Sequence, residues 1–116
     1  SGGSAAVDPR FEARAGHHLA PAVLSGGCKV YDRLGRGFTL LALGADPAAA
    51  RAFADAAQAT GVPLEVVADG EGGEAARYAA RLVLVRPDQF VAWAGDGCAD
   101  LQAARDILDR ARGVVA

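Results

Sequence analysis

The spacing of apolar residues predicts a central strand followed directly by a helix. Residues 38–43 form a nearly continuous apolar run between glycines, which is typical of a strand buried on both faces of a sheet. The next segment places Asp46 at a helix N-cap, Pro47 at the first helical position and Gly61 just beyond the end. We therefore expect a helix that ends at Thr60 and turns one apolar face to the sheet. That face comprises Ala49, Phe53, Ala56 and Ala57.

Short turns on either side of this unit predict two hairpins. Residues 22–24 and 28–31 flank Ser-Gly-Gly, and paired glycines supply the positive φ that a tight turn requires. Residues 81–85 and 89–93 flank Arg-Pro-Asp, in which the proline presets a turn. Two strands joined by so short a turn must run antiparallel.

The rest of the chain is expected to supply a second strand, a loop and a last helix. Residues 63–68 are predicted to form a strand parallel to the first, residues 69–74 a flexible loop, and residues 32–35 a short helical turn. The last helix is predicted over about residues 100–112 and would be ended by Gly113. Its apolar face would comprise Leu101, Ala104, Ile107, Leu108 and Ala111.

This order of elements predicts the fold class. A hairpin, a strand–helix–strand unit, a second hairpin and a terminal helix make an α/β, thioredoxin-like fold: a mixed central sheet flanked by helices, with an N-terminal hairpin. At 116 residues the chain has the length of one domain. We assign residues 16–116 to this domain. Residues 1–15 show no periodicity and are expected to be a linker or tail that opens with a cloning scar, and the absence of methionine suits a piece of a longer polypeptide.

Composition makes the packing depend on a few large side chains. Apolar residues make up 52% of the chain, but many of them are alanine and only 6% are aromatic. We therefore expect Phe38, Phe53, Phe90 and Trp93 to set much of the packing. One core between the sheet and the helices is predicted to contain Phe38, Phe53, Leu84 and Leu108.

The charge balance excludes several kinds of partner. The net charge is −2 and the pI is about 5.6, without a cluster of cations, so neither nucleic acid nor an anionic membrane is an expected partner. No apolar run reaches the roughly 18 residues that cross a bilayer, and no secretory segment opens the chain. We expect a cytoplasmic protein.

A thioredoxin-like fold raises the question of redox chemistry. Such chemistry needs a thiol between the central strand and its helix, because the helix N-terminus stabilises the thiolate. Residues 44–49 contain no cysteine, and residues 78–81, just before the third strand, contain no proline of the kind that completes such a site. The sequence thus predicts a thioredoxin-like domain without its catalytic site, and a stand-alone redox protein or peroxidase is the alternative.

The cysteines and histidines suggest no other reactive or metal site. Cys28 and Cys98 are far apart in the chain and are expected to be small structural residues. Adjacent histidines such as His17 and His18 point to opposite sides of an extended chain, so they do not have the spacing of a zinc module.

Glycine clusters and aromatic residues leave one further alternative open. The clusters at 35–37, 69–74 and 96–100 are explained by turns and caps, since none forms a strand-to-helix phosphate loop or a calcium loop. Trp93 and Tyr78 could line a pocket, which would make the chain a small-molecule binding module, although core packing also accounts for them.

Four sequence blocks, in matching order and spacing, resemble a known family. The blocks are Leu24-x-x-Gly27-x-x-Val30-Tyr31-Asp32-x-Leu34-Gly35-x-Gly37-Phe38-Thr39-Leu40-Leu41, then Gly61-Val62-Pro63-Leu64, then Leu82-Val83-Leu84-Val85-Arg86-Pro87-Asp88-Gln89, then Val91-Ala92-Trp93-x-Gly95-Asp96. Together they resemble the C-terminal domain of FAD-dependent aromatic-ring hydroxylases of the phenol hydroxylase, 3-(3-hydroxyphenyl)propionate hydroxylase and polyketide hydroxylase group. The resemblance extends over about residues 16–113. It departs at Ala20-Pro21, where the family often has Pro-His, and at Ala94, where it often has Arg.

The resemblance implies an accessory domain rather than a catalytic one. The parent enzyme would use FAD and NAD(P)H to hydroxylate an aromatic ring, with its FAD and substrate domains N-terminal to this segment. No catalytic, cofactor-binding or metal-binding residue is therefore assigned in this chain. The expected partners are the FAD and substrate domains of the parent chain and, in a homo-oligomer, a second copy. Candidate docking contacts are Arg86, Asp88, Trp93 and Asp96, although Arg86-Pro87-Asp88 is equally explained as a turn-forming sequence.

Overall fold

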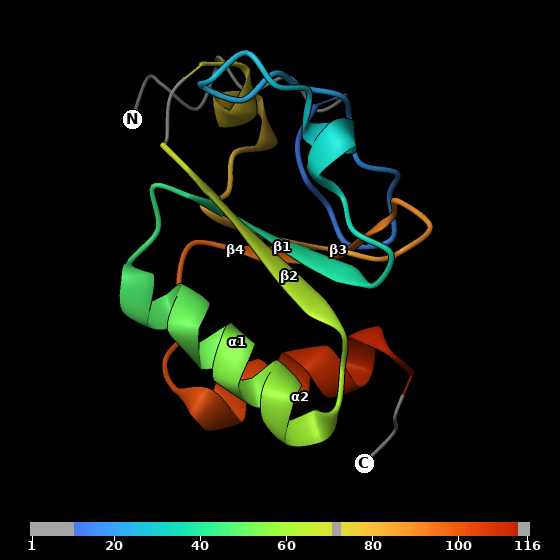
Figure 1. Cartoon of the computed structure of the whole chain (residues 1–116), viewed down its shortest axis with the longest axis vertical. Helices are drawn as coiled ribbons and strands as arrows, with labels where there is room; N and C mark the ends of the chain where they lie inside the picture. The colour runs from blue at the N-terminus through green and yellow to red at the C-terminus, as the bar shows by residue number, and fades with distance from the viewer. Residues whose placement is uncertain (1–10, 71–72, 114–116) are drawn as a thin grey trace.

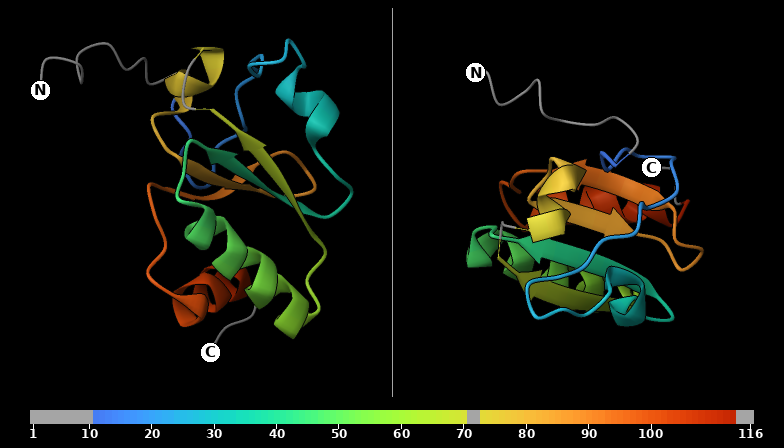
Figure 2. Two further views of the ribbon diagram at one scale, coloured as in Figure 1. Left: turned by 60° about the vertical axis from the view of Figure 1, so that its left-hand side comes forward. Right: turned by 90° about the horizontal axis from the view of Figure 1, so that it is seen from above.

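Two helices, a four-stranded sheet and a layer of coil are stacked on one another. The computed structural model describes residues 11–70 and 73–113. Figure 1 shows the helices below the sheet and the coil above it. The two further views in Figure 2 show that both helices cover the same face of the sheet.

The sheet is mixed, with its strands in the order β2-β1-β3-β4. β1 (Phe38–Leu43) lies in the interior, parallel to β2 (Leu64–Asp69) and antiparallel to β3 (Leu82–Val85). β4 (Val91–Gly95) pairs antiparallel with β3. These pairings confirm the predicted strand–helix–strand unit, the predicted second hairpin and the thioredoxin-like fold class.

Helix α1 (Pro47–Thr60) has the boundaries that its caps predict. The Asp46 carboxylate accepts a hydrogen bond from the backbone N–H of Ala48 at 2.9 Å, which satisfies one of the donors that a helix start leaves unpaired. Gly61 ends the helix with a φ of +74°, a conformation that glycine adopts without strain. All four side chains predicted to face the sheet are buried.

Helix α2 (Leu101–Ala111) packs beside α1. Asp100 caps its start by accepting a hydrogen bond from the N–H of Ala103 at 2.9 Å. Ala104 and Leu108 are buried as predicted, but Leu101 is 45% exposed, so its assignment to the buried face is wrong. The first turn of α2 lies at the rim of the helical layer (Figure 1). Neither helix of the described chain is long and apolar enough to cross a bilayer.

The second face of the sheet is covered mainly by coil and by two short 3-10 helices, Val30–Arg33 and Gly73–Tyr78. The turn of the predicted N-terminal hairpin is present, with Gly27 at a φ of +83°. The ladder of that hairpin, however, is a single bridge between Val23 and Lys29 rather than a pair of strands. The chain therefore reverses direction as predicted without adding strands to the sheet.

Two predicted boundaries in this coil layer are wrong. The helical turn expected at 32–35 forms two residues earlier, at 30–33. The loop expected at 69–74 has regular structure at both ends, because Asp69 is the last residue of β2 and a 3-10 helix begins at Gly73. These segments are held by contacts with distant parts of the chain, which local sequence patterns do not encode.

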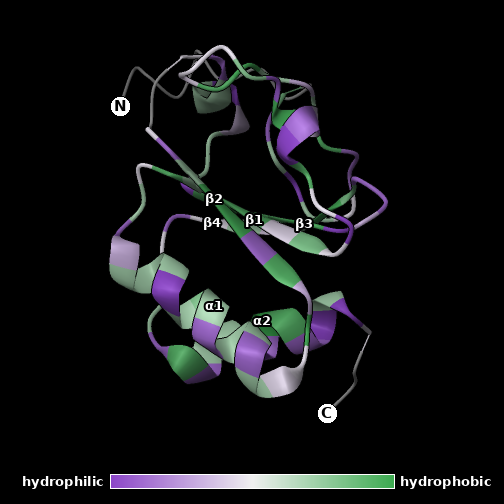
Figure 3. Cartoon of the chain, in the orientation of Figure 1, coloured by the Kyte–Doolittle hydropathy of each residue, from purple (hydrophilic) through white to green (hydrophobic). Residues whose placement is uncertain are grey.

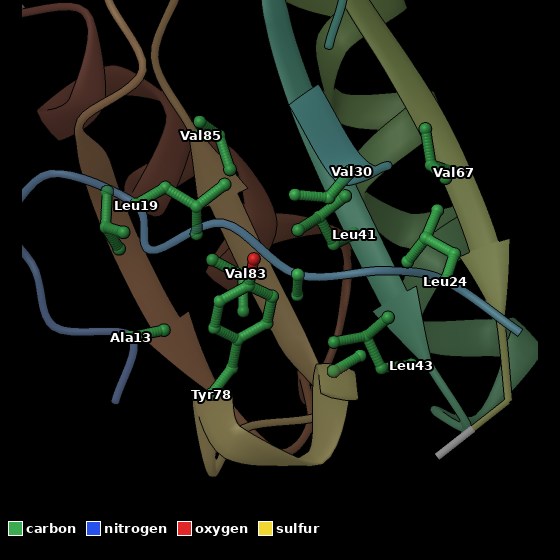
Figure 4. Close-up of a cluster of buried hydrophobic side chains, with 13 residues drawn as sticks. Ala13, Leu19, Leu24, Val30, Leu41, Leu43, Val67, Tyr78, Val83 and Val85 are labelled. Carbon is green, nitrogen blue, oxygen red and sulfur yellow. The ribbon is translucent and has the colours of Figure 1, made fainter. Parts of the chain in front are cut away.

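The sheet separates two hydrophobic cores. Toward the helices, Phe53, Leu84 and Leu108 are fully buried and Phe38 packs against them, which confirms the predicted core. Toward the coil layer lies a second core of mostly aliphatic side chains (Figure 4). Phe90 is 37% exposed, so the expectation that it sets the packing is wrong. It lies just after the β3–β4 turn, one residue before β4 begins.

Tyr78 is the largest fully buried side chain of the described residues, and it belongs to the second core. Its hydroxyl donates a hydrogen bond to the carbonyl of Ala20, in the coil that crosses the sheet. Burial raises the pKa of Tyr78, so the hydroxyl keeps its proton and remains a donor. Tyr78 thereby anchors the coil layer to the core that the layer covers.

The packed part of the chain begins before residue 16. Ala13 is buried and its N–H donates to the Tyr78 carbonyl at 2.9 Å, while the N–H of Gly16 donates to the Val91 carbonyl at 2.8 Å. The domain boundary after residue 15 stays a prediction. Residues 1–10, which include the expected cloning scar, lie outside the described residues.

Asp69 connects the end of β2 to the coil layer. Its carboxylate accepts hydrogen bonds from the hydroxyl of Ser25 and, at 2.8 Å, from the Ser25 backbone N–H. These two bonds hold the pKa of Asp69 below its usual range, because both stabilise the ionised form. The turn that contains Ser25 is thus held over the carboxyl end of the strand.

We expect Asp69→Asn to lower the thermal stability near neutral pH and to have little effect in acid. A lowered pKa means that the folded state stabilises the ionised carboxylate. This contribution is complete above the unfolded-state pKa of about 4 and is lost as the pH falls through the lower folded-state pKa. Melting midpoints of both proteins across this range measure the effect, with Ser25→Ala as the control that removes one donor without removing the charge. A difference that stays constant with pH would contradict the prediction.

We expect Phe53→Ala to lower the free energy of unfolding by about 3–5 kcal/mol, because it removes a fully buried ring. The Phe53 ring lies 5.4 Å from the Trp93 ring, centroid to centroid, so the variant also removes an aromatic pair. Denaturant titration measures the loss. Leu101→Ala is the matched control on the same helical layer, and its effect should stay within about 0.5 kcal/mol because Leu101 is exposed. Similar losses in the two variants would contradict this description of the core.

Candidate functional site

The connection from β1 to α1 is where a thioredoxin-like fold would place a reactive thiol. Here the connection is Gly44-Ala45-Asp46, without cysteine. The Asp46 carboxylate instead occupies the helix start by accepting from the N–H of Ala48. A negative charge at this point would raise the pKa of a neighbouring thiol and so disfavour a thiolate. This position therefore has no thiol nucleophile, and the Asp46 carboxylate would disfavour the ionisation of a thiol placed there.

The segment before β3 lies beside this connection, since the N–H of Leu43 donates to the Arg81 carbonyl at 2.7 Å. No peptide bond in the described residues is cis, and Ala79 has a φ of +57°. The segment before β3 and Leu43, the last residue of β1, border a hollow of about 200 Å³, which is below the roughly 300–1,000 Å³ of small-molecule sites. Its lining is small and mostly apolar: Leu43, Ala75, Ala76, Ala79, Ala80, Arg81 and Asp96.

The same helix start does not fit the pyrophosphate of FAD or of a nicotinamide cofactor. Dinucleotide sites use a glycine-rich strand-to-helix turn whose free N–H groups face the phosphates. In this turn the Asp46 carboxylate accepts a hydrogen bond from the N–H of Ala48, and its negative charge would repel a phosphate. Asp100 caps the start of α2 in the same way. No step of flavin chemistry is assigned to residues of this chain.

The two cysteines are free and lie in different layers of the fold. Cys28 follows the Gly27 turn in the coil layer, whereas Cys98 packs at the edge of the core between the sheet and the helices. Burial raises the pKa of the Cys98 thiol, which favours the unreactive protonated form. The structural role expected of the two thiols stays a prediction, with which the raised pKa of Cys98 agrees.

His18 lies in a contact with two other aromatic side chains, Tyr31 and Phe90. Within residues 11–70 and 73–113, no group of three or more His, Cys, Asp or Glu side chains is placed to hold a metal ion. The Nδ1 atom of His18 lies 3.0 Å from the hydroxyl of Tyr31. The His18 ring meets the Phe90 ring edge-on, with centroids 5.2 Å apart.

The structure does not bring the four candidate docking residues together. Arg86 and Asp88 form an exposed ion pair with 2.7 Å between Nη2 and Oδ2, and Asp88 also accepts from the N–H of Phe90 at 3.3 Å. Asp96, at the other end of this hairpin, accepts from the N–H of Arg81 at 3.2 Å. Trp93 lies on the helical side, against Phe53. Their role in docking stays a prediction, and the contacts of Arg86 and Asp88 agree with the turn-forming explanation.

A groove in the coil layer was not anticipated from the sequence. Its volume is about 340 Å³, within the range of binding sites. Its lining is mostly apolar and aromatic and includes three charged side chains: Phe11, Pro21, Ala22, Val23, Lys29, Tyr31, Glu74 and Arg77. Four separate segments supply these residues, and therefore no local motif could have indicated the groove.

Glu74 and Arg77 both make contacts inside this groove. The Glu74 carboxylate accepts a hydrogen bond from the backbone N–H of Val23 at 2.9 Å. The Arg77 guanidinium lies over the Phe11 ring, 4.7 Å from its centroid, at cation–π distance. These contacts give the groove a defined shape. Its charged side chains are two cations, Lys29 and Arg77, and the Glu74 carboxylate, which already accepts a hydrogen bond from the backbone.

Comparison with known proteins places these features in a family. Residues 12–114 match the family described as aromatic-ring hydroxylase, C-terminal. The FAD-dependent monooxygenase opdD of Penicillium oxalicum is 30% identical over 122 residues, covering 95% of this chain and 23% of that protein. The FAD-dependent monooxygenase apdD of Emericella nidulans is 36% identical over 102 residues, covering 84% of this chain and 16% of that protein.

Solved structures give the same result. The rebeccamycin biosynthetic enzyme RebC, determined with reduced flavin, aligns with a TM-score of 0.79 at 34% identity over 93% of this chain and 20% of RebC. Aklavinone-11 hydroxylase, in a ternary complex with FAD and aklavinone, aligns with a TM-score of 0.65 at 29% identity, covering 79% of this chain and 19% of the hydroxylase. The chain thus spans about a fifth of the length of the proteins that it matches.

Proposed function

Because the chain belongs to the family of aromatic-ring hydroxylase C-terminal domains, we propose that it is a non-catalytic accessory domain of a FAD-dependent aromatic monooxygenase. The domain docks on the FAD and substrate domains of the same protein and stabilises them. That protein uses NAD(P)H, acts in the cytoplasm and carries out its hydroxylation entirely in those other domains. A second copy of the protein is a further candidate partner.

One observation carries this proposal: the start of α1, where a thioredoxin-like fold would hold a reactive thiol, has a carboxylate and no cysteine. Asp46 places a carboxylate at the start of α1, and the hollow that Leu43 borders at the end of β1 is small and lined mainly by alanines. No buried side-chain nitrogen or oxygen within the described residues lacks a hydrogen-bond partner, so no internal polar group is left for a ligand. A domain whose described residues bring no nucleophile to the start of α1 is suited to a structural role.

The length relation supports the same proposal. The relatives named as FAD-dependent monooxygenases are four to six times longer than the segment that this chain matches, since that segment is 16–23% of each. The remaining four-fifths of such a protein must then contain the flavin site, because this chain does not fit a dinucleotide. The alternative of a pocket beside Trp93 is less favoured, since its ring packs on Phe53 in the core.

We expect the 116-residue chain, produced alone, to be colourless and to unfold cooperatively. Neither helix start binds a pyrophosphate, so excess FAD should be removed completely by dialysis, as judged by the visible spectrum. The chain should also fail to reduce a test disulfide in the presence of a thiol, because no thiolate stands at the start of α1. Stoichiometric flavin retained after dialysis, or thiol-dependent turnover, would overturn the accessory-domain proposal.

We expect deletion of this domain from the full-length protein to destabilise the remaining domains. Their melting midpoint should fall by several degrees and bound FAD should dissociate several-fold faster, because the docked surface becomes exposed to water. Differential scanning fluorimetry and flavin fluorescence measure the two effects. A deletion variant that keeps both values of the intact protein would show that the domain does not stabilise its neighbours.

A further inference from the structure

Phe90 is a large aromatic residue on the surface, between the β3–β4 turn and the first residue of β4. It is 37% exposed, although it precedes a strand whose first residue, Val91, is fully buried. Its contact partner is the His18 ring, which is itself exposed. Leaving such a ring in water is unfavourable, and an exposed aromatic residue in a patch of others is typical of an interaction surface.

The patch continues from Phe90 to the groove of the coil layer. The His18 ring lies 5.2 Å from the Phe90 ring and 6.0 Å from the Tyr31 ring, between centroids. Tyr31 also lines the groove, so three aromatic side chains connect the β3–β4 turn with it. The Tyr31 hydroxyl donates to the Leu19 carbonyl, which fixes the ring in place. We call this continuous patch the aromatic surface; it comprises Phe11, Pro21, Val23, Tyr31, His18 and Phe90.

The helical layer on the other side of the sheet has a different character. The outward side chains of α1 and α2 include Arg51, Asp55, Gln102, Arg105 and Asp106, all exposed. Figure 3 shows hydrophilic stretches along the outer sides of both helices. A mixed charged surface of this kind is typical of a face in contact with water. Of the two layers, the coil layer therefore offers the better docking surface.

We propose that the aromatic surface is the face on which the rest of the same polypeptide docks. This inference rests on the proposed function and goes beyond it by naming the face. In the relatives, some four-fifths of the protein lies outside the matching segment, and the family description makes that segment C-terminal. The rest of the chain therefore enters the domain just before residue 12, and Phe11 lines the groove. The preceding domains thus join the chain at the rim of this surface.

The charges of the groove specify the chemistry of the docked segment. Lys29 and Arg77 are exposed at its rim, whereas Glu74 is engaged by the backbone N–H of Val23. The groove therefore carries an excess of positive charge around an apolar floor. The segment that fits it presents an apolar or aromatic side chain to the groove and a carboxylate to Lys29 and Arg77.

Hydrogen exchange in the full-length protein, compared with the 116-residue chain alone, locates the docked face. Peptides that cover residues 17–31 and 86–90 should exchange several-fold more slowly in the full-length protein. Peptides that cover α2 should exchange equally in both. Slower exchange on the helices, with none on the aromatic surface, would overturn the proposal.

Matched substitutions in the full-length protein test the same face independently. Phe90→Asp places a charge on the aromatic surface, and Leu101→Asp places the same charge at a residue of similar exposure on the helical layer. Lys29→Glu and Arg105→Glu form a second pair, one on each layer. Phe90→Asp and Lys29→Glu should lower the midpoint of the neighbouring domains and speed FAD dissociation several-fold, whereas the two controls should not. Each variant should leave the melting of the 116-residue chain unchanged, which separates docking from folding.

The deletion variant separates a failure of this inference from a failure of the proposed function. Suppose that deletion of the domain has the expected effect, but that the helical control variants speed FAD dissociation and Phe90→Asp does not. The aromatic surface is then not the docking face, and the accessory role stands. If deletion itself has no effect, the accessory role fails. If Phe90→Asp dissociates a dimer in sedimentation without affecting FAD retention, the surface joins two copies and the inference is overturned.

Discussion

The burial of β1 on both faces is the constraint on which the rest of the structure depends. Leu40 and Ala42 point to the helices, and Leu41 and Leu43 point to the coil layer, all of them buried. Leaving one such leucine in water costs about 1.5–3 kcal/mol, so neither face of the strand can remain uncovered. The chain must therefore build two layers around one strand. It does so with two helices on one side and irregular backbone on the other.

The two layers differ in how far the sequence predicts them. The helical layer is encoded locally, since Asp46 and Gly61 mark the ends of α1 and the helical spacing places Phe53 on its buried face. The coil layer is not, because its shape depends on hydrogen bonds between residues 44 and 51 positions apart: Ser25 with Asp69, and Val23 with Glu74. Such pairs leave no periodicity in the sequence. This is why the hairpin ladder and the loop after β2 were predicted incompletely.

The features of the candidate site also differ in how far the sequence predicts them. The absence of a cysteine between β1 and α1 can be read from the sequence alone, because local patterns fix where that strand ends and that helix begins. The aromatic surface could not, because His18, Tyr31 and Phe90 lie in three segments far apart in the chain, which long-range contacts such as the bridge between His18 and Phe90 bring together. Hydrophobicity alone placed Phe90 in the core. Its position next to a turn, rather than within the strand, is what leaves it exposed.

The irregular layer has a consequence for how this domain meets a neighbour. Side chains on a straight helix form a convex ridge. The coil layer instead contains a groove, and hydrogen bonds between side chains and backbone hold its segments in place: the Val23 N–H donates to Glu74, and the Tyr78 hydroxyl donates to the Ala20 carbonyl. A concave apolar surface can accept a side chain of a partner and exclude water around it, which a convex charged helix cannot. The thioredoxin-like fold usually acts at the end of β1. In this chain a carboxylate stands at that end, and the groove lies in the coil layer, which covers the second core.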